Sequence, residues 1–232
     1  MFLQGHTKKF FCRLVFLLAV VLLCCGCTRQ HMSDKERIIA YLNSKYEDTF
    51  SFQSWSWEHY GSQDANANVL CRSMPGKFIC VGQRETDDGT LRYFDDYMAY
   101  QYESDIQQVL LEKVQSVYPD CKVIFMVDSS QFPDDMGATM SVQDIITNPD
   151  TVLSVYVITQ SDDEAGIARL REAFADSHMR VRGDVYFTDN KTAYQSISQD
   201  TYADWYYQDW YTACCQFSMD KNYEFYYADW LK

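Results

Sequence analysis

Along this chain, stretches whose apolar residues have the spacing of a helix alternate with stretches whose apolar residues have the spacing of a strand. A helix is predicted from Ser33, because residues 33–36 form a capping box and apolar residues then recur on one helical face, at Ile38, Ile39, Leu42 and Tyr46. Residues 49–57 alternate loosely and are rich in aromatic side chains, which predicts a strand. Residues 69–73 and 77–82 predict a hairpin, since Pro75 and Gly76 between them favour a turn. The first half is therefore expected to be rich in hairpins.

The second half begins with a longer helical pattern. Apolar residues recur at three- and four-residue spacing between Asp95 and Tyr118, and Pro119 ends the pattern. Lys122–Val127 is a continuous apolar run, which we expect to be a central strand. A short helix follows Ser141, and strands at 152–159 and 180–188 then enclose a helix at 164–175. The fold class predicted is α+β: a mixed or antiparallel sheet with helices packed on one face, and a strand-helix-strand unit in the second half.

Residues 1–26 have a different character from the rest. They contain no acidic residue, and Lys8, Lys9 and Arg13 precede an apolar run from Leu14 to Cys25. This order of charge and then hydrophobicity is typical of a secretory signal peptide. The run is about 13 residues, or roughly 20 Å as a helix, whereas a bilayer core is ~30 Å thick. A cleaved segment is therefore favoured over a retained transmembrane anchor.

The apolar run ends in Leu22-Leu23-Cys24-Cys25-Gly26-Cys27. This ending resembles the lipobox of bacterial lipoprotein signal peptides, in which Leu and two small residues precede the Cys that receives diacylglycerol, although Cys24 stands where Leu is usual. The resemblance implies lipidation of Cys27, with Cys25 as the alternative, and a location on the extracytoplasmic face of the cell membrane. Short motifs at 41–46 and 95–97 also resemble uncharacterised lipoproteins of Gram-positive gut bacteria, which implies no activity.

The domain organisation follows from this. We expect a signal peptide at 1–26, a lipidated tether at 27–32 and a globular extracytoplasmic domain at 33–232. The irregular stretch 128–140 holds Pro133 and Gly137 and is the candidate for a subdomain break.

Composition narrows the choice of partners. The chain has 20 basic and 33 acidic residues, a net charge of -13, which disfavours nucleic acid. With 47% hydrophobic residues, it is rich enough in apolar side chains to form a core. Removing residues 1–26 would remove three positive charges and no negative ones, so an anionic bilayer would repel the body. We therefore expect the lipid bilayer to be a partner only through the acylated Cys27.

A disulfide is predicted between Cys71 and Cys80. If the hairpin turns tightly at Pro75 and Gly76, the register pairs residue 73 with 78 and therefore residue 71 with 80, with Cβ atoms ~4.5–5.5 Å apart. Such a bond is permitted outside the cytoplasm. The alternative is that both cysteines are small buried apolar residues.

Catalytic motifs are absent from the sequence. We find no His-Glu-x-x-His, Gly-x-Ser-x-Gly or phosphate-binding glycine motif, and predict no catalytic residue, no metal and no cofactor. Asp95 and Asp96 are explained as the start of a helix. Asp128, with Asp134 and Asp135, is the acidic group that leaves a cation-binding hypothesis open.

The C-terminal segment is unusually aromatic, since 12 of the 33 residues from Asp200 to Lys232 are Tyr, Trp or Phe. Tyr and Trp rings suit protein or carbohydrate ligands, so a binding surface is one interpretation, with Tyr202, Trp205, Tyr206 and Trp210 as its candidate residues. The other interpretation is that these rings form an edge of the core.

The functional hypothesis is a noncatalytic binding module, tethered to the membrane, for a protein or carbohydrate ligand. An extracytoplasmic enzyme acting on cell-wall or peptide material is the first alternative, and it needs a cleft where titratable groups converge. An accessory subunit of a membrane complex is the second, and it needs a large apolar patch.

Overall fold

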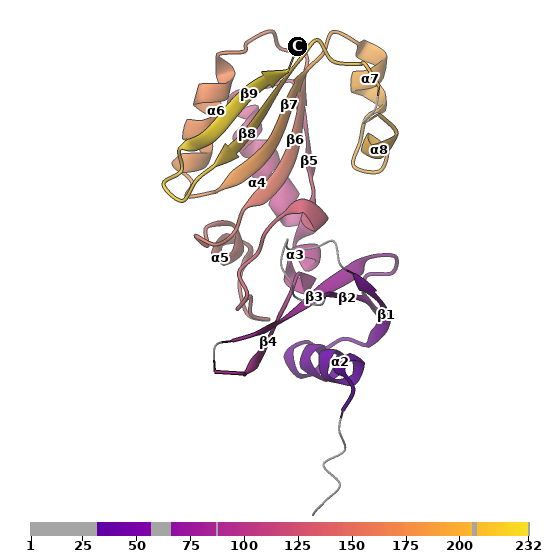
Figure 1. Cartoon of the computed structure of the whole chain (residues 1–232). Helices are drawn as coiled ribbons and strands as arrows, with labels where there is room; N and C mark the ends of the chain where they lie inside the picture. Colours follow the sequence, from indigo (N-terminus) through magenta and orange to yellow (C-terminus); the bar gives the residue numbers. More distant parts are fainter. Residues whose placement is uncertain (1–31, 57–65, 87, 206–207, 232) are drawn as a thin grey trace, which may run out of the picture.

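The computed structural model describes residues 32–56, 66–86, 88–205 and 208–231. These residues form two sheets joined by helices, which confirms the predicted α+β class (Figure 1). The first sheet is antiparallel, with strand order β1-β2-β3-β4. Its strands are β1 (Phe50–Ser56), β2 (Asn66–Cys71), β3 (Phe78–Glu85) and β4 (Leu91–Asp95). The first half is therefore a run of hairpins, as its turn signals predict.

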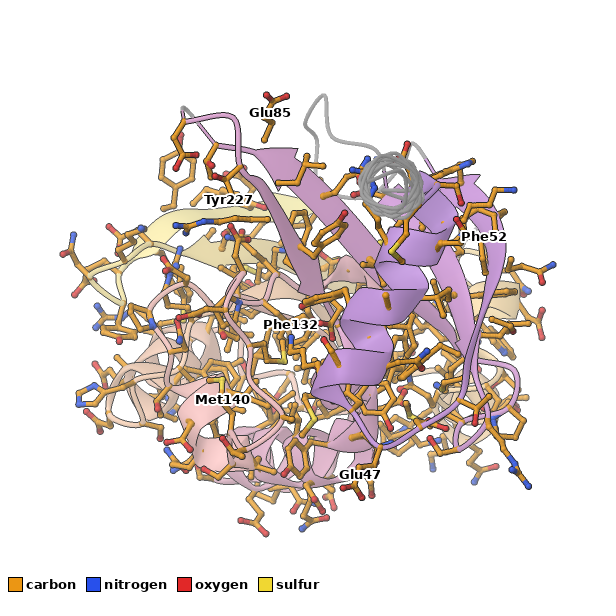
Figure 2. The ribbon with its side chains drawn as sticks, turned by 90° about the horizontal axis from the view of Figure 1, so that it is seen from below. Glu47, Phe52, Glu85, Phe132, Met140 and Tyr227 are labelled. Carbon is orange, nitrogen blue, oxygen red and sulfur yellow. The ribbon has the colours of Figure 1, made fainter. Side chains whose placement is uncertain are left out.

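Helix α2 (Asp34–Lys45) lies against the first sheet, and Figure 2 shows it in front of the strands when the molecule is seen from below. The predicted capping box is present: the Ser33 side chain accepts from the Glu36 backbone, and the Glu36 side chain accepts from the Ser33 backbone. Ile38 and Leu42 are fully buried. The Tyr41 ring stacks on Tyr93 of β4, with centroids 5.2 Å apart. The predicted amphipathic face is thus the one that packs on the sheet.

The single helix predicted from Asp95 to Tyr118 is wrong in its first part. Asp95 ends β4, and two helices follow, α3 (Tyr97–Gln101) and α4 (Glu103–Gln115). Four consecutive residues of α3 are buried, which one face of a continuous amphipathic helix could not achieve. The helix is interrupted at Tyr102, and α4 then buries one stripe of Ile106, Leu110 and Val114.

The second sheet is mixed, with strand order β5-β6-β7-β8-β9. Its strands are β5 (Cys121–Phe125), β6 (Leu153–Thr159), β7 (Val181–Phe187), β8 (Ala213–Met219) and β9 (Phe225–Leu231). Only β6 and β7 are parallel, and α6 (Gly166–Ala175) connects them, so the predicted strand-helix-strand unit is confirmed. The short helices are η1 (Val127–Ser129), α5 (Val142–Ile146), α7 (Lys191–Ser196) and α8 (Tyr202–Trp205).

Helices cover both faces of this second sheet (Figure 1). On one face, α4 and α6 pack over the main core, which is shared with the first sheet. On the other face, α7 and α8 cover a smaller cluster that includes Ile124, Ile158 and Tyr186. Because both faces of β5 are covered, its sequence is continuously apolar, like that of a central strand. The prediction of a central strand is wrong, since β5 lies at the edge of the sheet.

The segment 128–140, the candidate for a subdomain break, connects β5 to α5. The chain passes from the first sheet to the second before this segment, across α3 and α4. Phe132 and Met136 of this segment are buried in the core shared by both sheets. The two sheets are therefore packed together through it.

Candidate functional site

A groove runs beside the outer edge of β5, and its volume is about 640 Å³. One wall comes from α4, with Gln107, Leu111 and Gln115. The other wall is the connection between α7 and α8, residues 197–200. The floor is the strand itself, from Cys121 to Ile124. The two helical layers that cover the faces of the sheet thus extend past its edge and leave a slot between them.

Two glutamine side chains bind the backbone of the β5 edge. The Gln107 carboxamide accepts from the Phe125 N–H at 2.8 Å and donates to the Val123 carbonyl. The Gln199 carboxamide donates to the Phe125 carbonyl at 2.8 Å. These amides occupy the positions that the peptide groups of a neighbouring strand would take. Sequence reasoning missed both residues; the only signal was that Gln107 borders the buried stripe of α4.

The charged groups around the groove are mostly satisfied by neighbours. Lys77 pairs with Glu103, with Nζ 2.8 Å from the carboxylate. Lys122 Nζ donates to the carbonyls of Gln195 and Ile197, at 3.1 and 2.8 Å, and so holds the end of α7 against the strand. Asp200 is exposed and forms no ion pair with any residue that the structure describes. The groove is therefore lined by apolar and amide groups, with a carboxylate near one end.

The predicted aromatic surface is divided by the structure. Tyr202 and Trp210 are 5% and 4% exposed, so the core interpretation holds for these two rings. Trp205 is half-buried against the same cluster, and Tyr206 lies outside the described residues. Ile197, on the groove wall, belongs to this cluster as well. The rings therefore support the groove from behind instead of forming its surface.

The exposed rings of the C-terminal segment lie on β9. Tyr226 and Tyr227 are 80% and 42% exposed, and Leu231 on the same strand is also exposed. Because β9 is the opposite edge of the second sheet, these rings are far in strand order from the groove.

The predicted Cys71–Cys80 disulfide is wrong, since both thiols are free. The connection between β2 and β3 spans residues 72–77, and the register places Leu70 opposite Phe78 and Asn68 opposite Cys80. Cys71 and Cys80 consequently point to opposite faces of the sheet. Burial raises the pKa of each thiol, as it does for Cys121, whose pKa is raised to about 11. These cysteines are protonated at neutral pH and are poor nucleophiles. Cys27 lies outside the described residues.

The strongest polar cluster surrounds Asp95, which is buried between α2 and β4. Its carboxylate accepts from Tyr41, Tyr46 and Lys45, at 2.7, 2.8 and 2.6 Å respectively, and from the Tyr97 N–H at 3.1 Å. The hydrogen-bonding capacity of the Asp95 carboxylate is therefore fully used inside the protein. The cluster therefore fixes α2 to the sheet. The sequence predicted that Asp95 starts a helix, and only its contact with the Tyr97 N–H agrees with that role.

Asp96 is also buried and accepts from the Cys80 N–H at 2.8 Å. Burial raises the pKa of its carboxyl group well above the usual range, and the charges of Asp95 and Asp128 raise it further. Neither residue opens onto the groove.

Metal and histidine chemistry receive little support from the described part of the chain. No three His, Cys, Asp or Glu residues there are grouped so that they could hold a metal ion. The search covered Asp128, Asp134 and Asp135, the acidic residues of the cation-binding hypothesis. His178 is exposed and lies beside Tyr223, with ring centroids 5.6 Å apart. In the same residues, no helix has both the length and the apolar character needed to cross a membrane.

Comparison with known proteins assigns no family. No family model matches the chain, and no curated protein matches it. Among solved structures, the chain is similar to a DUF5037 family protein from Ruminococcus gnavus ATCC 29149, with a TM-score of 0.35 and 14% identity over 70% of this chain and 78% of that one. A likeness of this size carries no argument about fold or function.

Proposed function

We propose that this protein is a membrane-tethered lipoprotein whose extracytoplasmic domain is a noncatalytic binding module. The lipobox-like sequence before Cys27 supports the tether, and the groove beside β5 supports the binding role. An acylated Cys27 carrying two or more chains would hold the domain at the outer face, because each buried CH₂ contributes ~0.8 kcal/mol. The tether would confine the groove to a thin layer and so raise its effective concentration for neighbouring molecules.

The groove is the observation that carries the binding role. Its volume of about 640 Å³ lies within the range of ligand sites, and its lining combines Leu111 and Ile197 with glutamine side chains. An enzyme would need an ionisable acid, base or nucleophile there. Glu103 is paired with Lys77, Lys122 binds two carbonyls, and Cys121 is protonated at neutral pH. Asp200 is then the acidic group of the described lining that has no ion-pair partner, and one carboxylate is less than the converging set of groups that catalysis needs. Binding is therefore better supported than catalysis.

Site-specific photo-crosslinking in the native membrane tests this function. A photoreactive amino acid at Gln115, an exposed residue that lines the groove, is expected to give a discrete adduct. The same group at Glu172, exposed on α6, is the control and is expected to give none. Equal labelling from both positions, or none from residue 115, would contradict a binding role for the groove.

A further inference from the structure

We propose that the groove binds an extended segment of another polypeptide, which pairs with β5 as a sixth strand of the second sheet. This inference rests on the proposed function of the groove and names its partner class. The first support is topological, because β5 is an end strand and its residues form the floor of the groove. A strand beside it would complete a ladder that is otherwise open.

The second support is the helical cover on both sides of the slot. Neighbouring strands lie ~4.8 Å apart, so a sixth strand would lie between α4 and the 197–200 connection, with both of its faces covered. Its side chains would alternate between the wall of α4, with Leu111, and the wall formed by residues 197–200. The slot therefore fits a single extended segment of about five residues, the length of β5.

The third support is the hydrogen-bonding state of the edge. In an antiparallel ladder, backbone groups point alternately toward the partner strand and away from it. The glutamine contacts show that the Val123 carbonyl and both Phe125 groups point away from β6. The same alternation turns the Val123 N–H and the Cys121 backbone outward, and no described side chain binds these groups. They are free to pair with a peptide.

At the Phe125 end of β5, the carboxamides of Gln107 and Gln199 already form hydrogen bonds with the edge of the strand. A segment would pair with the Cys121 backbone and the Val123 N–H, and it would reach the Val123 carbonyl and Phe125 by displacing the carboxamides of Gln107 and Gln199. Asp200, exposed beside Gln199, favours a Lys or Arg on the segment at that end. The preferred partner is thus an extended segment that carries a Lys or Arg at the end nearest Asp200.

Heptapeptides selected from a random phage-displayed library on the purified full-length chain, in detergent micelles, provide the probe. Each selected peptide is resynthesised in two versions, in which one or the other alternate set of backbone amides is N-methylated. Strand pairing uses only one set, so one version is expected to lose binding and the other to keep it. Retention of affinity by both versions, or failure to enrich any peptide, overturns the inference.

The protein side is tested with Val123→Pro, which removes the outward N–H without removing a bond to β6. Binding of the selected peptides is expected to weaken about tenfold, the effect of one lost hydrogen bond. If this variant does not fold, Leu111→Arg places a charged side chain in the slot, with Gln108→Arg as the exposed control on the same helix. Unchanged affinity in the folded groove variant overturns the proposal.

The two proposals fail in different ways. Crosslinking from residue 115 combined with insensitivity to N-methylation would leave a binding groove that does not pair strands. Absence of both signals would remove the binding role as well.

Discussion

The Gln107 side chain accepts a hydrogen bond from the Phe125 backbone N–H at 2.8 Å and so takes the place of a missing strand at the β5 edge. This contact places a helix side chain where a peptide group would be. Val123, Ile124 and Phe125 are buried although β5 is an edge strand, because helices cover both faces of the sheet.

Gln107→Leu removes two hydrogen bonds to β5 while keeping the size of the side chain. We expect the free energy of unfolding to fall by about 1–2 kcal/mol, because the Phe125 N–H and the Val123 carbonyl lose their partners. Urea denaturation measures this. Gln108→Leu, exposed on the same helix, is the control and should stay within about 0.5 kcal/mol. Equal losses in the two variants would show that the contact contributes nothing specific.

Asp95→Asn leaves Lys45 without its counter-charge in the buried cluster between α2 and β4. We expect a loss of about 3 kcal/mol, since removing one partner of a buried ion pair leaves the other uncompensated. Thermal unfolding followed by circular dichroism measures the change. Asp34→Asn breaks the exposed pair with Arg37 and should cost less than about 1 kcal/mol. The account of the cluster is wrong if the two variants melt alike.

Asp96→Asn tests the raised pKa of the second buried carboxyl group. The folded protein holds this proton at pH values where the unfolded chain, with a pKa near 3.8, has released it. The free energy of unfolding of the native sequence therefore falls, through this group, as pH rises above that value. The amide still accepts from Cys80 but does not titrate.

The variant is therefore expected to gain stability relative to the native sequence between pH 4.5 and pH 8. Urea titrations at both values measure the difference, with exposed Asp135→Asn as the control. A difference that is the same at both values would contradict the assignment.

Gly183→Ala introduces a Cβ only 1.7 Å from the Val155 carbonyl oxygen of the neighbouring strand β6. Backbone on both sides must then move, so we expect the free energy of unfolding to fall by more than about 3 kcal/mol. The apparent melting temperature reports this loss. Gly137→Ala, where the nearest atom lies at 3.9 Å, should be nearly neutral. Comparable melting of the two variants would refute the close approach of β7 to β6.

Local elements could be predicted from this sequence because their signals are local. The Ser33 capping box, the turn residues of the first half and the β6-α6-β7 unit are each encoded within a few residues. The errors concern long-range relations. The Cys71–Cys80 pairing failed because the loop from 72 to 77 moved the register, which turn residues alone do not fix.

The candidate site was less predictable than the fold. β5 reads as a central strand because it is apolar on both faces, and its edge position depends on strands far away in sequence. Gln107 and Gln199 carry no motif, and they become meaningful only when the fold brings them to the same edge. The aromatic residues Tyr202 and Trp210 were a visible signal, but burial gives them a supporting role.

Fractionation of cells that express the native chain or Cys27→Ala tests the central claim most directly. The account predicts that the native protein sediments with membranes and is released by detergent but not by high salt, because acyl chains hold it. It also predicts that lipidation is lost in Cys27→Ala, whereas Cys25→Ala keeps it. A native protein found in the cytosol or free in the medium, or a Cys27→Ala variant that carries the same lipid, would contradict the account.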